Sequence, residues 1–450
     1  MTILESLAGF VHGVVPGRVS HQTIDRLRLH LFDTIGAIAV GSRLPEGAAM
    51  RAAMRHAPTA GTAMTPTRLG SAVAIACACA RCTEMDDIHL ASCTTPGAIV
   101  IPTALALLAA GYLRSFSDFV AAVIAGYDLV VRLGLAIDGP ARLADRVWPT
   151  RFAAPVGAAA VTARALGLDP GQTAGALATA LASASGTSIA PRPTTTSRWL
   201  GFGVAARHGV EAAQWALDDV RGNADLVERC AGRINGIDVS ATCLLDARGD
   251  RLALDDVGLK PYPVARQALA AVEACLALVR DHHLDPATVS AVTIGLPHAQ
   301  RPIVDHPGMP ADRFATLVSV QYLAAVALVD PDRLLDAQRD PPFDHPVVRR
   351  IASRVEVVHA PDLDRLYPTA WPARVTIVDR DRRVTSEIVQ PVGDVSTSFG
   401  WTDVTRKLVH ALDGLSDAPD IDHLASTIQA LDFTSALPDL WGLTQSGSGS

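Results

Sequence analysis

From about residue 20 to residue 255 the chain repeats one pattern, in which apolar segments of helical length alternate with short breaks that contain Gly or Pro. The segments are rich in Ala, Leu and Val, and several, such as 119–137, are apolar nearly all round. A helix without a polar face is stable only where other elements cover it. This part of the chain is therefore expected to form a large helical domain with a buried core.

One helix boundary follows from its capping residues. In the stretch LDPGQTAGALATALASASG, Asp169 is expected as the N-cap, Pro170 at the first helical position and Gln172 at the third, with Gly186 after the end. Asp accepts hydrogen bonds from the amides of the first turn, and Pro has no amide there that needs a partner. These residues predict a helix that begins at Pro170.

After Lys260 the pattern changes. A helix is expected over about 265–280, and VSAVTIGLP (289–297) and VEVVHA (355–360) alternate as strands do. ARVTIV and VTSEIVQP read as a hairpin over the charged turn DRDRR, and helical periodicity returns at Trp401. We predict a mainly α protein whose helical domain is formed by residues 1–257 and 397–445. An α+β domain, 258–396, is inserted between them, and Ser-Gly-Ser-Gly-Ser at 446–450 is expected to be an added linker.

The overall composition limits the possible partners. Hydrophobic residues make up 49% of the chain and charged residues 19%, which suits a large buried core. A net charge of −7 argues against nucleic acid, because phosphate binding needs a basic face. The longest apolar run, 98–113, contains Pro102 and is shorter than the roughly 18 residues of a membrane span. No basic segment followed by an apolar one stands at Met1, so neither an export signal nor a membrane partner is expected.

Seven cysteines, an odd number in a long chain, are expected to be reduced thiols. Cys77, Cys79 and Cys82 are spaced closely enough to raise the possibility of a metal site. No complete set of four ligands accompanies them, and small apolar residues around them suit tight helix packing. The packing interpretation is favoured, and no metal is predicted.

Lysine is rare in this chain, because only Lys260 and Lys407 are lysines among 39 basic residues. Arg serves wherever a plain positive charge is enough, whereas Lys can also lose its proton when it is desolvated. A lysine that persists against this bias points to a task that Arg does not perform.

The most polar segment between two apolar runs is EMDDIHLASCTTPGA, residues 84–98. It carries carboxylates, an imidazole, a thiol and hydroxyls, and such groups are costly to bury unless they have partners. The residues alone leave two interpretations open, an active-site loop and a polar turn.

Several motifs occur in an order that resembles the MmgE/PrpD family, which includes 2-methylcitrate dehydratase, cis-aconitate decarboxylase and iminodisuccinate epimerase. They are EMDD-H followed by PGAIVIPTALAL, then AGYDLVVRLGLA, WPT, GFGVAARHGVEAA, LKPYP, SVQYLAAVAL and QPVGD. The resemblance runs over nearly the whole chain. It implies a large all-helical domain with a smaller α+β lid domain, a cytoplasmic homodimer, an active site between the domains, and chemistry without metal or organic cofactor.

The resemblance also implies proton removal or delivery at a carbon next to a carboxylate, which needs an acid/base group and cations. Lys260 of LKPYP is predicted as general base or carboxylate clamp, and Tyr322 of SVQY as a second catalytic group. Asp86 and His89 are predicted catalytic candidates in the loop. The structural alternatives are a surface charge for Lys260, a core tyrosine for Tyr322, a cap or ion pair for Asp86, and a turn histidine for His89.

The chain departs from the family pattern at its histidines. Thr95 stands in place of the His of His-Pro-Gly, Trp148 in place of the His of His-Pro-Thr, and Ala265 in place of a decarboxylase histidine. Ile88 replaces a Thr, and Arg198 replaces a Lys. The added bulk of Trp148 favours a smaller or more apolar substrate than a tricarboxylate.

Further residues are predicted to bind substrate. Arg198 is expected to hold a carboxylate bidentately, Trp148 to shape the pocket and Arg151 to anchor an anion. Thr95, Asp87 and Cys93 complete the predicted set, Cys93 also as a possible thiol acid/base. DHPG at 305–308 lies outside the motif's context and is not assigned to the site.

Three functions remain open at this point. The preferred one is a cofactor-independent lyase, of dehydratase or decarboxylase type, acting on a small organic acid. An isomerase or epimerase would begin with the same proton abstraction. A catalytically inactive relative that binds a ligand is the third, and the missing histidines are its support.

Overall fold

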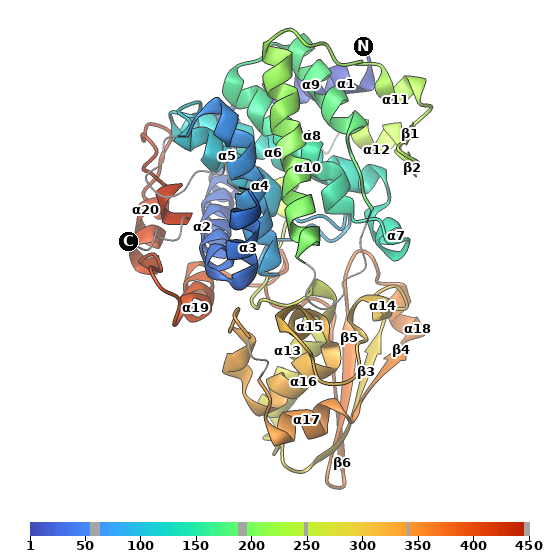
Figure 1. Cartoon of the computed structure of the whole chain (residues 1–450). Coiled ribbons are helices and arrows are strands. Elements are labelled where there is room, and N and C mark those ends of the chain that lie inside the picture. The colour runs from blue at the N-terminus through green and yellow to red at the C-terminus, as the bar shows by residue number, and fades with distance from the viewer. Residues whose placement is uncertain (55–63, 188–195, 247–250, 340–342, 445–450) are drawn as a thin grey trace. The chain divides into compact units, whose positions relative to one another are not determined.

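The computed structural model describes residues 1–54, 64–187, 196–246, 251–339 and 343–444 (Figure 1). The chain divides into two compact units. The helical unit takes its described residues from Met1–Ala190, Thr196–Gly258 and Leu412–Ser450, and the second unit from Leu259–Ala411. The predicted linker, 446–450, lies outside the described residues.

The helical unit is built from helices that cover one another, as the apolar sequence segments predict. Its helices are α1 (Ile3–Gly13), α2 (His21–Arg43), α3 (Pro45–Ala53), α4 (Pro66–Cys82), α5 (Gly97–Ala109), α6 (Phe116–Ala136), α7 (Gly139–Ala144), α8 (Pro149–Leu166), α9 (Pro170–Ala182), α10 (Ser197–Leu217), α11 (Leu226–Arg229), α12 (Ala241–Leu245) and α20 (Ile421–Gln429). Short strands β1 (Arg233–Ile234) and β2 (Ile237–Asp238) form a small antiparallel ladder. Helix α10 packs against both α4 and α8, and α8 also packs against α6 (Figure 1).

Helix α6 is the core helix of this unit. Among the described helices it alone is long and apolar enough, by length and composition, to cross a membrane, yet almost all of it is buried inside the unit. The expectation that the segment 119–137 is covered by other helices is confirmed. Its apolar character therefore reflects packing in the core.

The predicted start of α9 is confirmed. The Asp169 side chain accepts from the Gln172 amide, and the Gln172 side chain accepts in return from the Asp169 amide. The helix ends earlier than Gly186 suggests, with Ser183 as its C-cap. The start is a local feature of the sequence, whereas no such cap motif marks the end.

The second unit is α+β. It contains α13 (Arg266–His282), α14 (Arg301–Val304), α15 (Arg313–Val318), α16 (Val320–Val329), α17 (Pro346–Ala352), α18 (Pro361–Asp364) and α19 (Trp401–Leu412), with strands β3 (Val289–Leu296), β4 (Val355–His359), β5 (Ala373–Asp379) and β6 (Arg382–Ile388). The sheet order is β4-β3-β5-β6. Only the β3–β4 pair is parallel, and the predicted hairpin of β5 and β6 is confirmed. Helix α13 packs against β5 and β6, and α16 packs against α13 (Figure 1).

The mainly α fold with a small mixed sheet agrees with the predicted fold class. The division into units differs from the sequence boundaries at one helix. The sequence assigns 397–445 to the helical domain, whereas the second unit continues to Ala411 and includes nearly all of α19. A contact far apart in sequence joins this helix to the second unit, because Lys407 on α19 hydrogen-bonds to the main chain at Lys260.

Candidate active site

In the helical unit, the loop between α4 and α5 is tied to the core through Asp87. One carboxylate oxygen, Oδ2, lies 3.0 Å from His30 Nδ1 and accepts from the Tyr127 hydroxyl at 2.8 Å. The other, Oδ1, accepts from the Gly97 amide at 2.9 Å, at the first residue of α5. Asp87 thus joins α2, α6 and the start of α5, and a carboxylate with three donors is well compensated for its burial.

The glycine of Thr-Pro-Gly is required by the same cluster. A Cβ on Gly97 would lie 2.6 Å from Asp87 Oδ2 and 2.8 Å from the Tyr127 oxygen. These distances are shorter than any ordinary contact, so the loop packs against α5 only because the residue at 97 has no side chain. Burial and the nearby carboxylate raise the pKa of Tyr127 well above its ordinary value, which keeps its hydroxyl a donor.

A tight turn from His89 to Thr94 follows. His89 and Thr94 pair through two main-chain hydrogen bonds, and the His89 ring Nδ1 accepts from the Ser92 amide at 3.1 Å. That bond leaves the ring proton on Nε2 in the neutral imidazole. Cys93 adopts a left-handed conformation in the turn, and burial raises the pKa of its thiol to about 12. Cys93 is therefore a thiol rather than a thiolate at neutral pH.

Two other residues of the loop form hydrogen bonds with parts of the helical unit outside the loop. Ile88 exchanges two main-chain hydrogen bonds of 2.9 Å with Gly258. Thr95 donates its amide to the Thr150 hydroxyl on α8 at 3.1 Å. The main chain on both sides of His89 is therefore held by elements outside the loop.

Arg81, at the end of α4, forms ion pairs with two acidic residues of the loop. Its Nη1 lies 2.7 Å from Glu84 and 3.2 Å from Asp86, and all three residues are buried. Burial opposes the charge on Arg81, but the two carboxylates raise its pKa above the ordinary value. Asp86 is thus placed in an ion pair, which is one of the alternatives that the sequence left open.

Beside this ion pair lies what we call the arginine–tryptophan cluster: Arg81, Arg198, Trp148 and Trp199. The Arg81 guanidinium lies 5.2 Å from the Trp148 ring centroid and 5.5 Å from that of Trp199. Arg198 lies 5.1 Å and 4.3 Å from the same two rings. Cations over indole faces gain energy when they are desolvated. The bulky Trp148, at the start of α8, also stacks on Phe202 of α10 at 5.1 Å.

Burial affects the two arginines predicted to bind anions. It lowers the pKa of Arg198 to about 10, with Arg81 acting in the same direction and Glu84 opposing. Burial also lowers the pKa of Arg151, whose Nη1 donates to the Thr187 carbonyl at 2.5 Å. Both guanidiniums remain charged at neutral pH. An anion bound to either guanidinium would offset part of the free-energy cost of burying its charge.

In the second unit, main-chain hydrogen bonds hold the residues next to Lys260. The Leu259 amide donates to the Gly393 carbonyl at 2.9 Å, and the Lys260 carbonyl accepts from Lys407 Nζ at 2.9 Å. Gly393 has a φ of +93°, and a Cβ there would lie 1.9 Å from the Leu259 oxygen. The LKPYP and QPVGD motifs are therefore in direct contact. Lys260 itself is 1% exposed.

Tyr322, on α16, is part of the core of the second unit. Its hydroxyl accepts from the Phe343 amide at 3.0 Å, and burial raises its pKa. Its amide is capped by the Ser319 hydroxyl at 3.3 Å. These contacts match the structural alternative for Tyr322, a core tyrosine whose hydroxyl has a partner.

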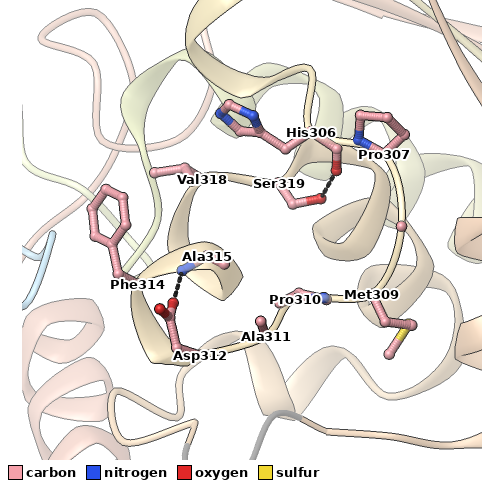
Figure 2. Close-up of a pocket in the computed structure, with 11 residues that line it drawn as sticks. His306, Pro307, Met309, Pro310, Ala311, Asp312, Phe314, Ala315, Val318 and Ser319 are labelled. Atoms are coloured by element: carbon pink, nitrogen blue, oxygen red, sulfur yellow. Dashed lines mark hydrogen bonds between the residues drawn. The ribbon is translucent and has the colours of Figure 1, made fainter. Parts of the chain in front are cut away.

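The second unit also carries a pocket of about 210 Å³ that includes His306 and Gly308 of DHPG (Figure 2). Its lining is mostly apolar: His306, Pro307, Gly308, Met309, Pro310, Ala311, Asp312, Phe314, Ala315, Val318 and Ser319. Figure 2 shows its polar groups bonded to the wall itself, Ser319 to the His306 carbonyl and Asp312 to the Ala315 amide. None of the predicted site residues lines it.

The comparisons with known proteins now decide the family. Residues 5–240 match the MmgE/PrpD N-terminal domain, and residues 262–432 match the MmgE/PrpD C-terminal domain. This chain belongs to the MmgE/PrpD family. Among curated MmgE/PrpD relatives, cis-aconitate decarboxylase of Homo sapiens is 26% identical over 396 residues, which are 80% of this chain and 77% of the human protein.

Two further relatives are similar at the same distance. Cis-aconitate decarboxylase of Mus musculus is 26% identical over 82% of this chain and 78% of its own length. A cis-aconitate decarboxylase-like protein of Aspergillus oryzae is 24% identical over 80% of this chain and 79% of its own length. The chain is thus an MmgE/PrpD member distantly related to cis-aconitate decarboxylases, in a family of lyases.

At each of the three positions where the resemblance implies histidine, the residue present makes structural contacts. Thr95 bonds to Thr150, Trp148 belongs to the arginine–tryptophan cluster, and the Ala265 amide donates to the Leu317 carbonyl at 2.8 Å before α13. Among the described residues, no three His, Cys, Asp or Glu side chains gather as metal ligands would.

Sequence reasoning missed five residues that the structure adds to the two candidate regions. They are His30, Tyr127, Arg81, Trp199 and Lys407. Only Lys407 carried a signal in the sequence, its rarity as a lysine. The others are far from their partners along the chain, or stand inside ordinary helical patterns.

Proposed function

We propose that this chain is a cofactor-independent lyase that removes a proton from the carbon next to a carboxylate or carbonyl of a small organic acid. Lys260 takes the proton as general base, and its alternative role is that of an ammonium ion that holds the substrate carboxylate. The electron pair left on carbon then expels a group from the neighbouring carbon, which completes the elimination. A decarboxylation instead loses carbon dioxide and returns a proton to carbon.

The observation that carries the proposal is the burial of Lys260 in a family motif. Lysine is almost never fully buried in proteins, because burying its charge is costly. Here Lys260 is 1% exposed in a chain that uses Arg at nearly every other basic position. A buried lysine in the LKPYP motif of a lyase family is best explained by chemistry.

The arginine–tryptophan cluster supports a substrate smaller or more apolar than a tricarboxylate. Arg198 supplies a charge for one carboxylate, and burial has already lowered its pKa to about 10. Trp148 and Trp199 supply apolar surface beside it, where an imidazole would have supplied a second polar group. Arg151 is the second candidate for anion binding. We therefore expect a mono- or dicarboxylic acid with an apolar part.

The test is proton NMR in D₂O over a panel of carboxylic acids. The panel includes cis-aconitate, 2-methylcitrate and smaller mono- and dicarboxylic acids with an acidic carbon–hydrogen bond. A new alkene or decarboxylated product, lost in Lys260→Met, supports the lyase. Exchange or inversion without elimination would replace it by an isomerase or epimerase, which begins with the same abstraction.

Silence over the whole panel, together with saturable binding of one acid, would overturn the enzyme proposal in favour of a binding protein. The contacts of Tyr322 and the three replaced histidines are the observations behind that outcome. The proposal further includes a homodimer that acts in the cytoplasm, as family membership suggests. Light scattering at several concentrations tests the dimer.

A further inference from the structure

Both lysines of the chain lie in the second unit, and both are fully buried. Lys260 is 1% exposed and Lys407 is 0% exposed. Arg fills the other basic positions of the chain. Burying an ammonium ion is unfavourable unless it gains partners. Two fully buried lysines in the same unit, in a chain that otherwise uses Arg, are therefore expected to share a role.

The two lysines are in direct contact across 147 residues of sequence. Lys407 Nζ, on α19, donates to the main-chain carbonyl of Lys260 at 2.9 Å. A hydrogen bond from an ammonium ion to a carbonyl is charge-assisted, so it is stronger than one between neutral groups. The contact therefore fixes one side of the Lys260 peptide firmly.

The other side of the same residue is fixed as well. The Leu259 amide donates to the Gly393 carbonyl, and Gly393 approaches the Leu259 oxygen too closely for any side chain. In addition, Arg266 pairs with Asp394, next to Gly393. These contacts hold the main chain on both sides of the Lys260 Cα. They therefore fix the position of this Cα, from which the side chain extends.

We propose that Lys407 is a positioning residue for Lys260. Its ammonium ion holds the Lys260 carbonyl and thereby sets where the Lys260 amine stands when a proton moves. The proposal rests on the proposed function, because positioning matters only if Lys260 acts on a substrate. The position also suits a lysine, because a compact ammonium ion at the end of a flexible chain reaches this carbonyl at a fully buried site.

The first test needs no substrate, because the chain has only two lysines. Lysine labelled with ¹³C at Cε gives one side-chain signal for each, assigned with Lys260→Met and Lys407→Met. We expect Lys407→Met to shift and broaden the Lys260 signal, because the released peptide samples more than one position. Lys407→Gln, whose amide can donate to the same carbonyl, should keep the signal narrow. An unchanged Lys260 signal in Lys407→Met would overturn the proposal.

The second test uses the acid that the D₂O panel identifies. We expect Lys407→Met to lower kcat by about 10–100-fold, the size of effect that a small misplacement of a reacting group produces. KM should change by less than about threefold, because substrate binding does not need the Lys260 carbonyl. Lys407→Gln should keep kcat within about threefold of the unaltered protein. A loss confined to KM, or equal loss in the Met and Gln variants, would contradict positioning through this hydrogen bond.

Arg350→Met is the matched control in the same unit. Arg350 donates to the carbonyls of Pro286 and Ala287 at 2.6 Å and 2.7 Å, so its loss also removes a cation from main-chain carbonyls. Arg350→Met should leave both lysine signals and kcat unchanged. If Arg350→Met changed them as much as Lys407→Met does, both variants would reflect a general loss of structure, and the proposal would be overturned. If no acid reacts, the proposed function fails, while the labelled lysines still decide whether Lys407 fixes Lys260.

Discussion

The loop of residues 84–97 and the segment of residues 259–266 both carry main-chain and side-chain contacts, but the contacts of their central residues differ. In the loop, the Asp87 side chain is the centre of a cluster, because its carboxylate accepts from three donors. In the segment, the main chain beside the candidate lysine is held, at the Leu259 amide and the Lys260 carbonyl. We therefore expect the Asp87 side chain to affect stability first, and the Lys260 side chain to affect chemistry.

The largest expected effect on stability is at Asp87. Asp87→Ala leaves His30, Tyr127 and the Gly97 amide without their acceptor, so the free energy of unfolding should fall by about 3–5 kcal/mol. Asp87→Asn keeps the volume and one acceptor oxygen and should lose less. Urea unfolding followed by circular dichroism measures both. A loss below about 1 kcal/mol in the Ala variant would mean that the loop is not held by this side chain.

Gly393→Ala is expected to disrupt the main-chain contact between Gly393 and Leu259. The added Cβ would lie 1.9 Å from the Leu259 oxygen at a φ of +93°, and main-chain atoms cannot move aside as a flexible side chain can. We expect a loss of about 3 kcal/mol or more in the free energy of unfolding, from the clash and the left-handed conformation together. Gly400→Ala is the control, because a Cβ added at Gly400 would have no other atom of the described residues within 4 Å, its chain neighbours apart. Equal thermal stability of the two variants would contradict the clash.

Gly97→Ala should cost less, about 1–3 kcal/mol, because the atoms that it meets belong to side chains. Tyr127→Phe removes one of them, the hydroxyl 2.8 Å from the added Cβ. The two substitutions should therefore couple, so that the double variant loses less than the sum of the single losses. A double-mutant cycle by urea unfolding measures this coupling, and strict additivity would show that Tyr127 does not crowd Gly97.

The smallest expected effect is a pH dependence next to the Lys260 segment. Glu273 on α13 hydrogen-bonds to Tyr262 of LKPYP, and burial raises its pKa from 4.5 to about 7. Between these values the unfolded chain has lost the proton that the folded chain keeps, so stability falls as pH rises. Below pH 4.5 the Glu273 carboxyl is protonated in both the folded and the unfolded chain. Above pH 7 the loss of stability is complete.

Glu273→Gln should remove this slope. Compared with the unaltered protein, the Gln variant should gain about 1–3 kcal/mol between pH 4.5 and pH 8. Unfolding by urea at several pH values gives the difference. A parallel pH profile for the two proteins would show that the carboxyl is charged in the folded state throughout.

What the sequence could predict is what depends on neighbours along the chain. The Asp169 cap, the alternating strands and the apolar α6 are local patterns, and each is present in the structure. The end of α9 and the place of α19 were not predictable in this way. The contact that brings α19 into the second unit joins residues 147 apart.

The same limit applies to the candidate residues. The sequence marks 84–98 as polar and Lys260 as unusual, but it does not reveal that His30 and Tyr127, 57 and 40 residues from Asp87, supply the donors. Nor does it reveal that Trp148 meets Arg81. The chemical type of a side chain suggests a role, whereas its partners decide between a structural and a catalytic one.

Lys260→Met tests the central claim most directly, when stability and proton exchange are measured on the same preparation. The account predicts that the variant still folds, because the main-chain contacts at 259 and 260 do not need the lysine side chain. It also predicts that proton exchange into the substrate in D₂O falls by about 100-fold or more, the contribution of a general base. Exchange that continues at the original rate in a folded Lys260→Met variant would contradict it.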